Sequence, residues 1–206
     1  MFTFYTRLAA TLAILIVTIS AAGSALARSS AGAEPAPPEA PAAASLLLRG
    51  SDVPGLVTYT SASGRLSLWE SAERENGQRA VLRRAHWRGG ARRTFGQSTV
   101  SLYGVLSIES RVFVFADAKG AKRALPRLAP SGLHLASGRL PLVGGARVYM
   151  HEDTVEGISE LALATQFRQR NVISRVMIVG TPGIIDRSHL LATARRQAMR
   201  VAQALT

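Results

Sequence analysis

Hydrophobic and polar residues alternate most regularly between residues 160 and 179. Over 160–167, the larger residues Leu161, Leu163, Thr165 and Phe167 alternate with Glu160, Ala162, Ala164 and Gln166. Residues 172–179 are again mostly apolar after a polar turn at 168–171. Alternation with a period of two is typical of a half-buried strand, and a four-residue connection is too short for a parallel crossover. Asn171 suits a positive φ in the turn. The pattern therefore predicts an antiparallel hairpin.

Other segments also favour strands. Residues 99–115 are rich in Val, Ile, Phe and Ser, which predicts a long or bent strand. Alternation would place Ile108, Ser110, Val112 and Val114 on one face and Glu109, Arg111, Phe113 and Phe115 on the other. The chain becomes strand-like after Gly89-Gly90, and residues 146–151 predict another strand. Residues 126–145 predict a loop.

Helical patterns separate these strands. Residues 66–85 predict an interrupted helix, and Asp117 is placed to cap a short alanine-rich helix. A C-terminal helix is expected after a cap at Asp186 or Ser188. Its apolar stripe consists of Leu190, Leu191, Ala194, Ala198, Val201, Ala202 and Leu205.

The order of these elements indicates the fold class. Helices and strands do not alternate regularly, and the clearest strands are joined by a hairpin, so the sequence predicts an α+β domain. We expect an antiparallel sheet covered by helices on one face. Roughly 160 residues form one domain that buries about 70% of its unfolded surface, so the lack of cysteine does not prevent folding.

The N-terminus predicts export. Arg7 is followed by an uncharged apolar run over residues 8–23, and Ala25 and Ala27 stand three and one residues before Arg28. This is the pattern of a secretory signal peptide, and we expect cleavage after Ala27. The alternative is a retained membrane anchor formed by residues 8–27, because about 20 apolar residues suffice to cross a bilayer.

The predicted domain organisation follows from composition. Residues 1–27 are the signal peptide or anchor, and residues 28–44 are a disordered linker of mainly Ala, Pro, Gly and Glu, which offer little apolar area to offset ordering. Residues 45–206 form the exported domain. Its expected location is extracytoplasmic, either secreted or periplasmic after cleavage or attached to the membrane through residues 8–27.

Several short motifs carry a resemblance that covers most of the chain from Leu46 onward. They are Leu46-Leu47-Leu48 with Asp52-Val53-Pro54-Gly55, Val112-Phe113-Val114-Phe115 followed by Asp117, and Phe167-Arg168 with Asn171-Val172. With these motifs the chain resembles a loose set of uncharacterised exported proteins of high-GC bacteria. Their plan is similar to that of PsbP- and Mog1-like α+β domains. The resemblance implies no catalytic residues.

Sites for catalysis, metals and cofactors are not indicated. His86, His134, His151 and His189 lack the spacing of zinc ligands, and cysteine is absent. The dense cluster His151-Glu152-Asp153 is interpreted as a solvated strand end, because adjacent strand residues face opposite sides. No serine lies in a Gly-x-Ser-x-Gly motif, and no glycine motif has phosphate-loop spacing. We expect no cofactor. An exported hydrolase with a dispersed site stays an alternative.

Charge is the feature with the most functional content. The chain has 25 basic and 13 acidic residues, giving a net charge of +12. A dense group of arginines surrounds His86 and Trp87 with no acidic residue between them, and such a group attracts anions. It consists of Arg79, Arg83, Arg84, Arg88, Arg92 and Arg93. The alternative interpretation is a solvated face at a junction between helix and strand.

The expected partners follow from charge and location. Guanidinium groups suit phosphate and carboxylate, so an exported arginine-rich surface favours anionic lipid, a wall polymer or an acidic protein surface. Nucleic acid is disfavoured by export. A further alternative is a small-ligand pocket lined by Phe113, Phe115 and Phe167. The sequence predicts no oligomeric state.

Overall fold

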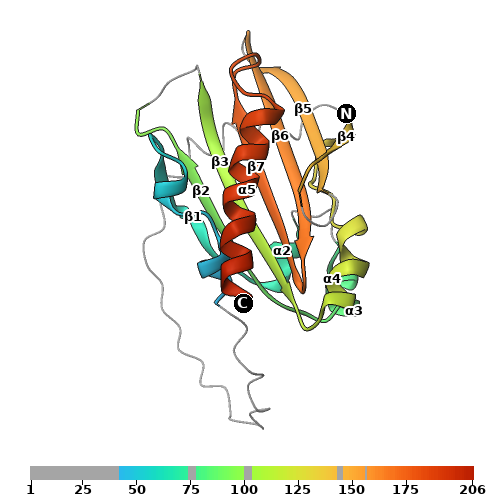
Figure 1. The fold of residues 1–206 in the computed structure, drawn as a ribbon. Helices are drawn as coiled ribbons and strands as arrows, with labels where there is room; N and C mark the ends of the chain where they lie inside the picture. The colour runs from blue at the N-terminus through green and yellow to red at the C-terminus, as the bar shows by residue number, and fades with distance from the viewer. Residues whose placement is uncertain (1–41, 74–77, 100–103, 143–145, 156) are drawn as a thin grey trace, which may run out of the picture. The chain divides into compact units, whose positions relative to one another are not determined.

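The structure is a computed structural model that describes residues 42–73, 78–99, 104–142, 146–155 and 157–206. The predicted signal peptide or anchor and the cleavage site at Ala25, Ala27 and Arg28 lie outside these residues, as does most of the predicted linker. The described part forms a single domain around one seven-stranded antiparallel sheet (Figure 1). The strand order is β1-β2-β3-β7-β6-β5-β4.

In the described part of the chain, α-helices follow the first, the third and the last strand. The strands are β1 (Val57–Leu66), β2 (Trp87–Gly96), β3 (Val105–Phe115), β4 (His134–Leu140), β5 (Ala146–Val155), β6 (Ile158–Gln169) and β7 (Val172–Gly180). The α-helices are α2 (Leu68–Glu73), α3 (Arg79–Arg84), α4 (Ala118–Ala124) and α5 (Arg187–Ala204). Short 3-10 helices are η1 (Ala43–Leu46), η2 (Gly50–Asp52) and η3 (Leu125–Arg127).

The predicted hairpin is confirmed as β6 and β7. Leu163 pairs with Ile178 in the antiparallel register, and only Arg170 and Asn171 separate the strands. The expected conformation of Asn171 is wrong, because the positive φ (50°) belongs to Arg170. Asn171 instead uses its side chain: Nδ2 donates to the carbonyl oxygen of Phe115 at 2.9 Å. This bond ties the turn to the end of β3.

Both edge strands were missed by the sequence patterns. The expected loop at 126–145 is wrong, since it contains η3 and the strand β4. The expected helix at 66–85 is confirmed as α2 and α3, but Leu66 is the last residue of β1. Most side chains of β1 and β4 are exposed or half-buried, and their glycines (Gly64 and Gly138) adopt positive φ. Neither strand therefore shows regular apolar alternation.

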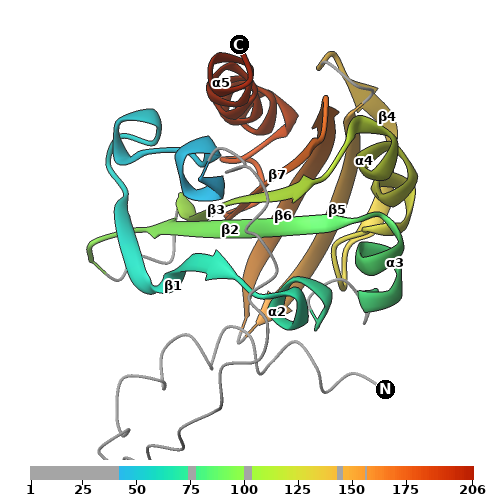
Figure 2. The same ribbon diagram turned by 90° about the horizontal axis from the view of Figure 1, so that it is seen from below.

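The expectation that helices cover one face of the sheet is also wrong. The two faces of β3 separate as predicted, but both are apolar: Ile108 belongs to the core beneath α5, whereas Phe113 and Phe115 pack against residues of α3 and α4. Figure 2 shows α5 on one side of the sheet and α2 on the other. Because apolar rings on the second face need cover, helices occupy both sides.

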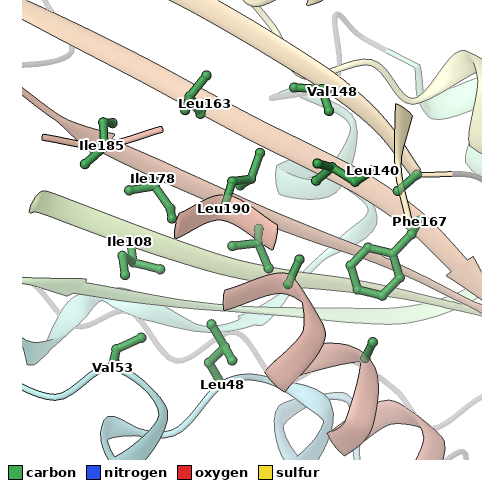
Figure 3. Close-up of a cluster of buried hydrophobic side chains, with 14 of the residues drawn as sticks. Leu48, Val53, Ile108, Leu140, Val148, Leu163, Phe167, Ile178, Ile185 and Leu190 are labelled. Atoms are coloured by element: carbon green, nitrogen blue, oxygen red, sulfur yellow. The ribbon is translucent and has the colours of Figure 1, made fainter. Parts of the chain in front are cut away.

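The face beneath α5 carries the largest core. Ile108, Ile178, Leu163 and Phe167 come from three neighbouring strands and point toward Leu190 of α5 (Figure 3). A buried polar chain fixes the helix on this core: the Leu48 N–H donates to Ser110 Oγ at 3.1 Å, and Ser110 Oγ donates to Gln197 Oε1 at 2.8 Å. Gln197 Nε2 in turn donates to the Arg111 carbonyl at 3.2 Å. Burial is tolerated because these groups are hydrogen-bonded.

The predicted helix caps are confirmed. Asp117 accepts a hydrogen bond from the Gly120 N–H at 2.6 Å, and Asp186 accepts bonds from the N–H groups of Ser188 and His189. Both carboxylates satisfy N–H groups that the first helical turn leaves without partners. In the C-terminal stripe Leu190, Ala194, Ala198 and Val201 are buried, while Ala202 is exposed.

Asp52 joins the segment before β1 to α5. Arg200 Nε and Nη2 donate to its two carboxylate oxygens at 2.5 and 2.9 Å, and the Arg49 N–H donates at 2.7 Å. Burial acts to raise the pKa of Asp52, but the hydrogen bonds from Arg200 and Arg49 and the charges of Arg200 and Arg196 lower it overall.

This ion pair predicts a pH dependence of stability. Because the pKa of Asp52 is lower in the folded state, its contribution is present at neutral pH and is lost as the pH falls below the ordinary carboxyl range of about 4. Asp52→Asn should therefore be less stable than wild type at pH 7, and the difference should shrink toward pH 3. Urea unfolding of both proteins at the two pH values measures this. A difference independent of pH would contradict the assignment.

Candidate anion-binding surface

Two short helices meet where β3 ends. Figures 1 and 2 both show α3 and α4 side by side. The Ala116 N–H donates to the His86 carbonyl at 2.9 Å, and Arg123 Nη2 donates to the Arg84 carbonyl at 3.4 Å. Beneath the helices lie the fully buried rings of Phe113 and Phe115. The core therefore fixes the position of both helices.

The outer sides of these helices are strongly basic. We call the exposed cations of α3, α4 and their junctions the α3–α4 basic surface: Arg83, Arg84, Arg88, Lys119, Lys122, Arg123 and Arg127. Three of the seven belong to the predicted arginine group. The other four follow in the chain about 30 residues later, and the fold brings them beside the first three.

Asp117 is the one acidic residue within residues 78–88 and 116–128. The Gly120 N–H holds its pKa below the usual range. Burial acts to raise this pKa, and the Lys119 N–H and the charges of Arg123 and His86 act to lower it. Its oxygen is engaged in capping α4. The local charge is therefore strongly positive.

Arg79 lies next to this surface but is engaged with an aromatic ring. Its guanidinium carbon lies 3.9 Å from the ring centroid of Trp69 on α2, a cation–π contact. Trp87, at the start of β2, is half-buried and packs on the core beneath α3. Trp87 is therefore a packing residue beneath the basic surface.

The remaining two predicted arginines do not join the surface. Arg92 and Arg93 are neighbours in β2, so they point to opposite faces of the sheet. Arg93 Nη1 donates to the Leu48 carbonyl at 2.7 Å on the α5 side. Both side chains are half-buried. The predicted group of six arginines is thus divided among α3, the start of β2 and the two sheet faces.

Arg92 belongs to a row of polar side chains that crosses the face opposite α5. The register of the sheet places these side chains directly opposite one another on successive strands, from β2 to β4. In that order they are Arg92, Arg111, Arg175, Gln166, Arg147 and Arg139. Arg111 and Arg175 are only 2% and 3% exposed, so they act within the fold. Arg111 pairs with buried Glu109 at 2.8 Å, and Arg175 donates to Gln166 and the Leu128 carbonyl.

The structure does not bring together the residues of the other candidate sites, the phenylalanine pocket and the His151-Glu152-Asp153 cluster. The rings of Phe113, Phe115 and Phe167 are fully buried, and Phe167 lies in a different core from the other two, so these three rings pack in the cores and do not line one pocket. His151 Nε2 lies 3.9 Å from Asp153. Within the described ranges, no three His, Asp or Glu side chains are placed to hold a metal ion together.

None of the helices in the described segments is both long enough and apolar enough to span a bilayer. The predicted anchor at residues 8–27 lies outside these segments.

The fold and the basic surface define an α+β domain with helices on both faces of a seven-stranded antiparallel sheet. No protein-family model matches the chain, and no curated protein matches it. Among solved structures, it is similar to the extracellular domain of PknH from Mycobacterium tuberculosis. The two share 13% sequence identity with a TM-score of 0.41, over 78% of this chain and 92% of that chain. A likeness at this level carries no argument about function.

Proposed function

We propose that this chain is an exported, non-catalytic domain that binds an anionic component of the cell envelope through the α3–α4 basic surface. The observation that carries the proposal is the gathering of seven exposed cations around one capping carboxylate. Export is supported by the N-terminal pattern of residues 1–27.

The electrostatic attraction between the basic side chains and an anionic surface is large enough for binding, even without a shaped pocket. A Lys or Arg close to an anionic membrane surface contributes about 1 kcal/mol, so a few simultaneous contacts give measurable affinity. Five of the seven cations are arginines, whose planar groups suit phosphate and carboxylate. The surface would therefore bind through charge and would depend on salt.

Vesicle binding tests the proposal. The full chain should sediment with phosphatidylglycerol vesicles much more than with neutral phosphatidylcholine vesicles, because only the former attract the basic surface. Insertion of the apolar N-terminal segment would not distinguish the two lipids. Raising the salt from 50 to 500 mM should abolish the difference, since the Debye length falls well below 10 Å. Equal binding to both lipids at low salt would contradict the proposal.

Competition experiments distinguish the possible anionic ligands, which are membrane lipid, wall polymer and acidic protein. A soluble anionic wall polymer that displaces the protein from phosphatidylglycerol vesicles would identify the polymer as an alternative ligand of the same surface. Displacement by an acidic protein at the same charge concentration would indicate a protein partner instead. We expect the membrane itself to bind, because the seven cations are exposed on α3, α4 and the segments next to them.

A further inference from the structure

A pocket lies under the first half of α5, at the end of the sheet away from α3 and α4. Its volume is about 580 Å³, within the usual range for small-molecule sites. It is bounded by the turn at 53–56, by residues 97–99 after β2, by β3 and β7, and by α5. The α5 residues that line it are His189, Thr193 and Arg196.

The floor of the pocket is apolar. Ile108 of β3 and Ile178 of β7 are directly paired across the sheet, and both side chains point toward α5 (Figure 3). Val53 belongs to the same buried cluster as Ile108, and Leu56 and Val105 also line the pocket. Such a surface favours an apolar ligand group, because its burial removes hydrocarbon from water.

The rim of the pocket is polar and positive. Arg196 is exposed, and its Nη1 donates to the Asp52 carbonyl at 2.7 Å, which holds the guanidinium at the rim with one of its five N–H groups. Gln97, Ser98 and Thr193 add further hydrogen-bonding groups. No carboxylate is among the described lining residues.

His189 is oriented by the helix cap. Asp186 Oδ1 lies 2.8 Å from His189 Nδ1 and also accepts bonds from Ser188. The Ser188 side chain and the His189 N–H hold the pKa of Asp186 far below its usual range, so this carboxyl is an acceptor near neutral pH. Nδ1 must therefore carry the proton. The other nearby carboxylate, Asp52, is engaged by Arg200.

From this arrangement we infer that the pocket binds a small amphipathic carboxylate, with its apolar body against the half-buried side chains of Leu56 and Val105 beside the buried floor, and its head group at Arg196. Charge complementarity supports this occupant, since Arg196 places a guanidinium at the rim and no carboxylate is among the described lining residues. The bond to Asp52 pre-positions Arg196, which reduces the ordering that binding requires.

This site is independent of the α3–α4 basic surface. The strand β2 runs from Trp87, next to α3, to Gly96, next to the pocket. At about 3.3 Å per residue the two ends are roughly 30 Å apart. The two functions can therefore fail separately.

Calorimetry with dodecanoate, below its micelle concentration, tests the inference on the full chain. We expect dodecanoate to bind, and both acetate and dodecanol to bind at least tenfold more weakly. Acetate lacks the apolar body, and dodecanol lacks the charge. Arg196→Gln should weaken dodecanoate binding about tenfold, as loss of a charge-assisted hydrogen bond does. Arg195→Gln, an exposed neighbour outside the lining, is the matched control and should bind like wild type.

A second variant tests the pocket itself without changing the charge that binds the head group. Ser98→Trp places a large ring at an exposed position of the lining and should reduce dodecanoate binding while leaving the unfolding midpoint unchanged. Absence of dodecanoate binding to wild type would overturn the inference. Equal affinity of wild type, Arg196→Gln and Ser98→Trp would also overturn it. A variant with a neutralised α3–α4 basic surface should keep full dodecanoate affinity, whatever happens to vesicle binding.

Discussion

Glu109→Leu should lower the free energy of unfolding by about 3 kcal/mol, because it removes one partner of a buried ion pair. Glu109 and Arg111 are 8% and 2% exposed, and their side chains meet at 2.8 Å. Arg111 also stands directly between Arg92 and Arg175 on the neighbouring strands. Like charges opposite one another destabilise a sheet, so the carboxylate that pairs with Arg111 has a large effect.

A double variant separates this explanation from a simple packing defect. Glu109→Leu combined with Arg111→Leu removes both charges, and buried ion pairs replaced by apolar residues often retain stability. We expect the double variant to be at least about 1 kcal/mol more stable than Glu109→Leu alone. Urea unfolding of the two variants and wild type measures this. A double variant that is less stable than the single one would contradict the role assigned to the pair.

The second large effect is expected at Gly120, on the side of α4 that faces α3. A Cβ atom at this position would lie 2.2 Å from the Ala85 carbonyl oxygen, which is backbone and cannot rotate away. Gly120→Ala should therefore destabilise the domain by about 3 kcal/mol, at the upper end for overpacking. It should also weaken vesicle binding, because α3 and α4 must separate.

Gly50→Ala is the matched control for this substitution. A Cβ at Gly50 would meet no atom within 4 Å, so the same chemical change should leave stability nearly unaltered. Thermal unfolding of the two variants beside wild type compares them. Equal unfolding midpoints for Gly120→Ala and wild type would show that the close contact between α3 and α4 is not present.

Central elements of the fold were predictable because burial imposes a pattern on them. The hairpin of β6 and β7, the alternating faces of β3 and the caps at Asp117 and Asp186 all followed from local sequence. The edge strands β1 and β4 did not, since their side chains are mostly solvated and their pairing depends on neighbours distant in sequence. The second helix-covered face was missed for a related reason. Phe113 and Phe115 indicated an apolar second face, but nothing local said which helices would cover it.

The candidate surface was predicted only in its α3 part. Arg83, Arg84 and Arg88 follow one another closely in the chain, so local charge density identified them. Lys122 and Arg123 escaped notice because they follow Arg88 by more than 30 residues in the chain, and only the packing of α4 beside α3 brings them to the same surface. The basic residues that follow the Asp117 cap were the available signal. The pocket under α5 had no sequence signal, since five separate segments form it. The resemblance to PsbP- and Mog1-like domains stays a prediction.

We expect anions to bind because of the α3–α4 basic surface and not because of the net charge of the chain. Changing Arg83, Arg84, Lys122 and Arg123 to glutamine and measuring sedimentation with phosphatidylglycerol vesicles at 50 mM salt tests this expectation. The matched control changes four exposed arginines elsewhere, Arg65, Arg139, Arg187 and Arg195, and so removes the same charge. We predict that the first variant loses at least tenfold in vesicle affinity and that the control keeps affinity within about twofold of wild type, since contacts at the surface contribute about 1 kcal/mol each. Equal losses in the two variants would contradict the claim.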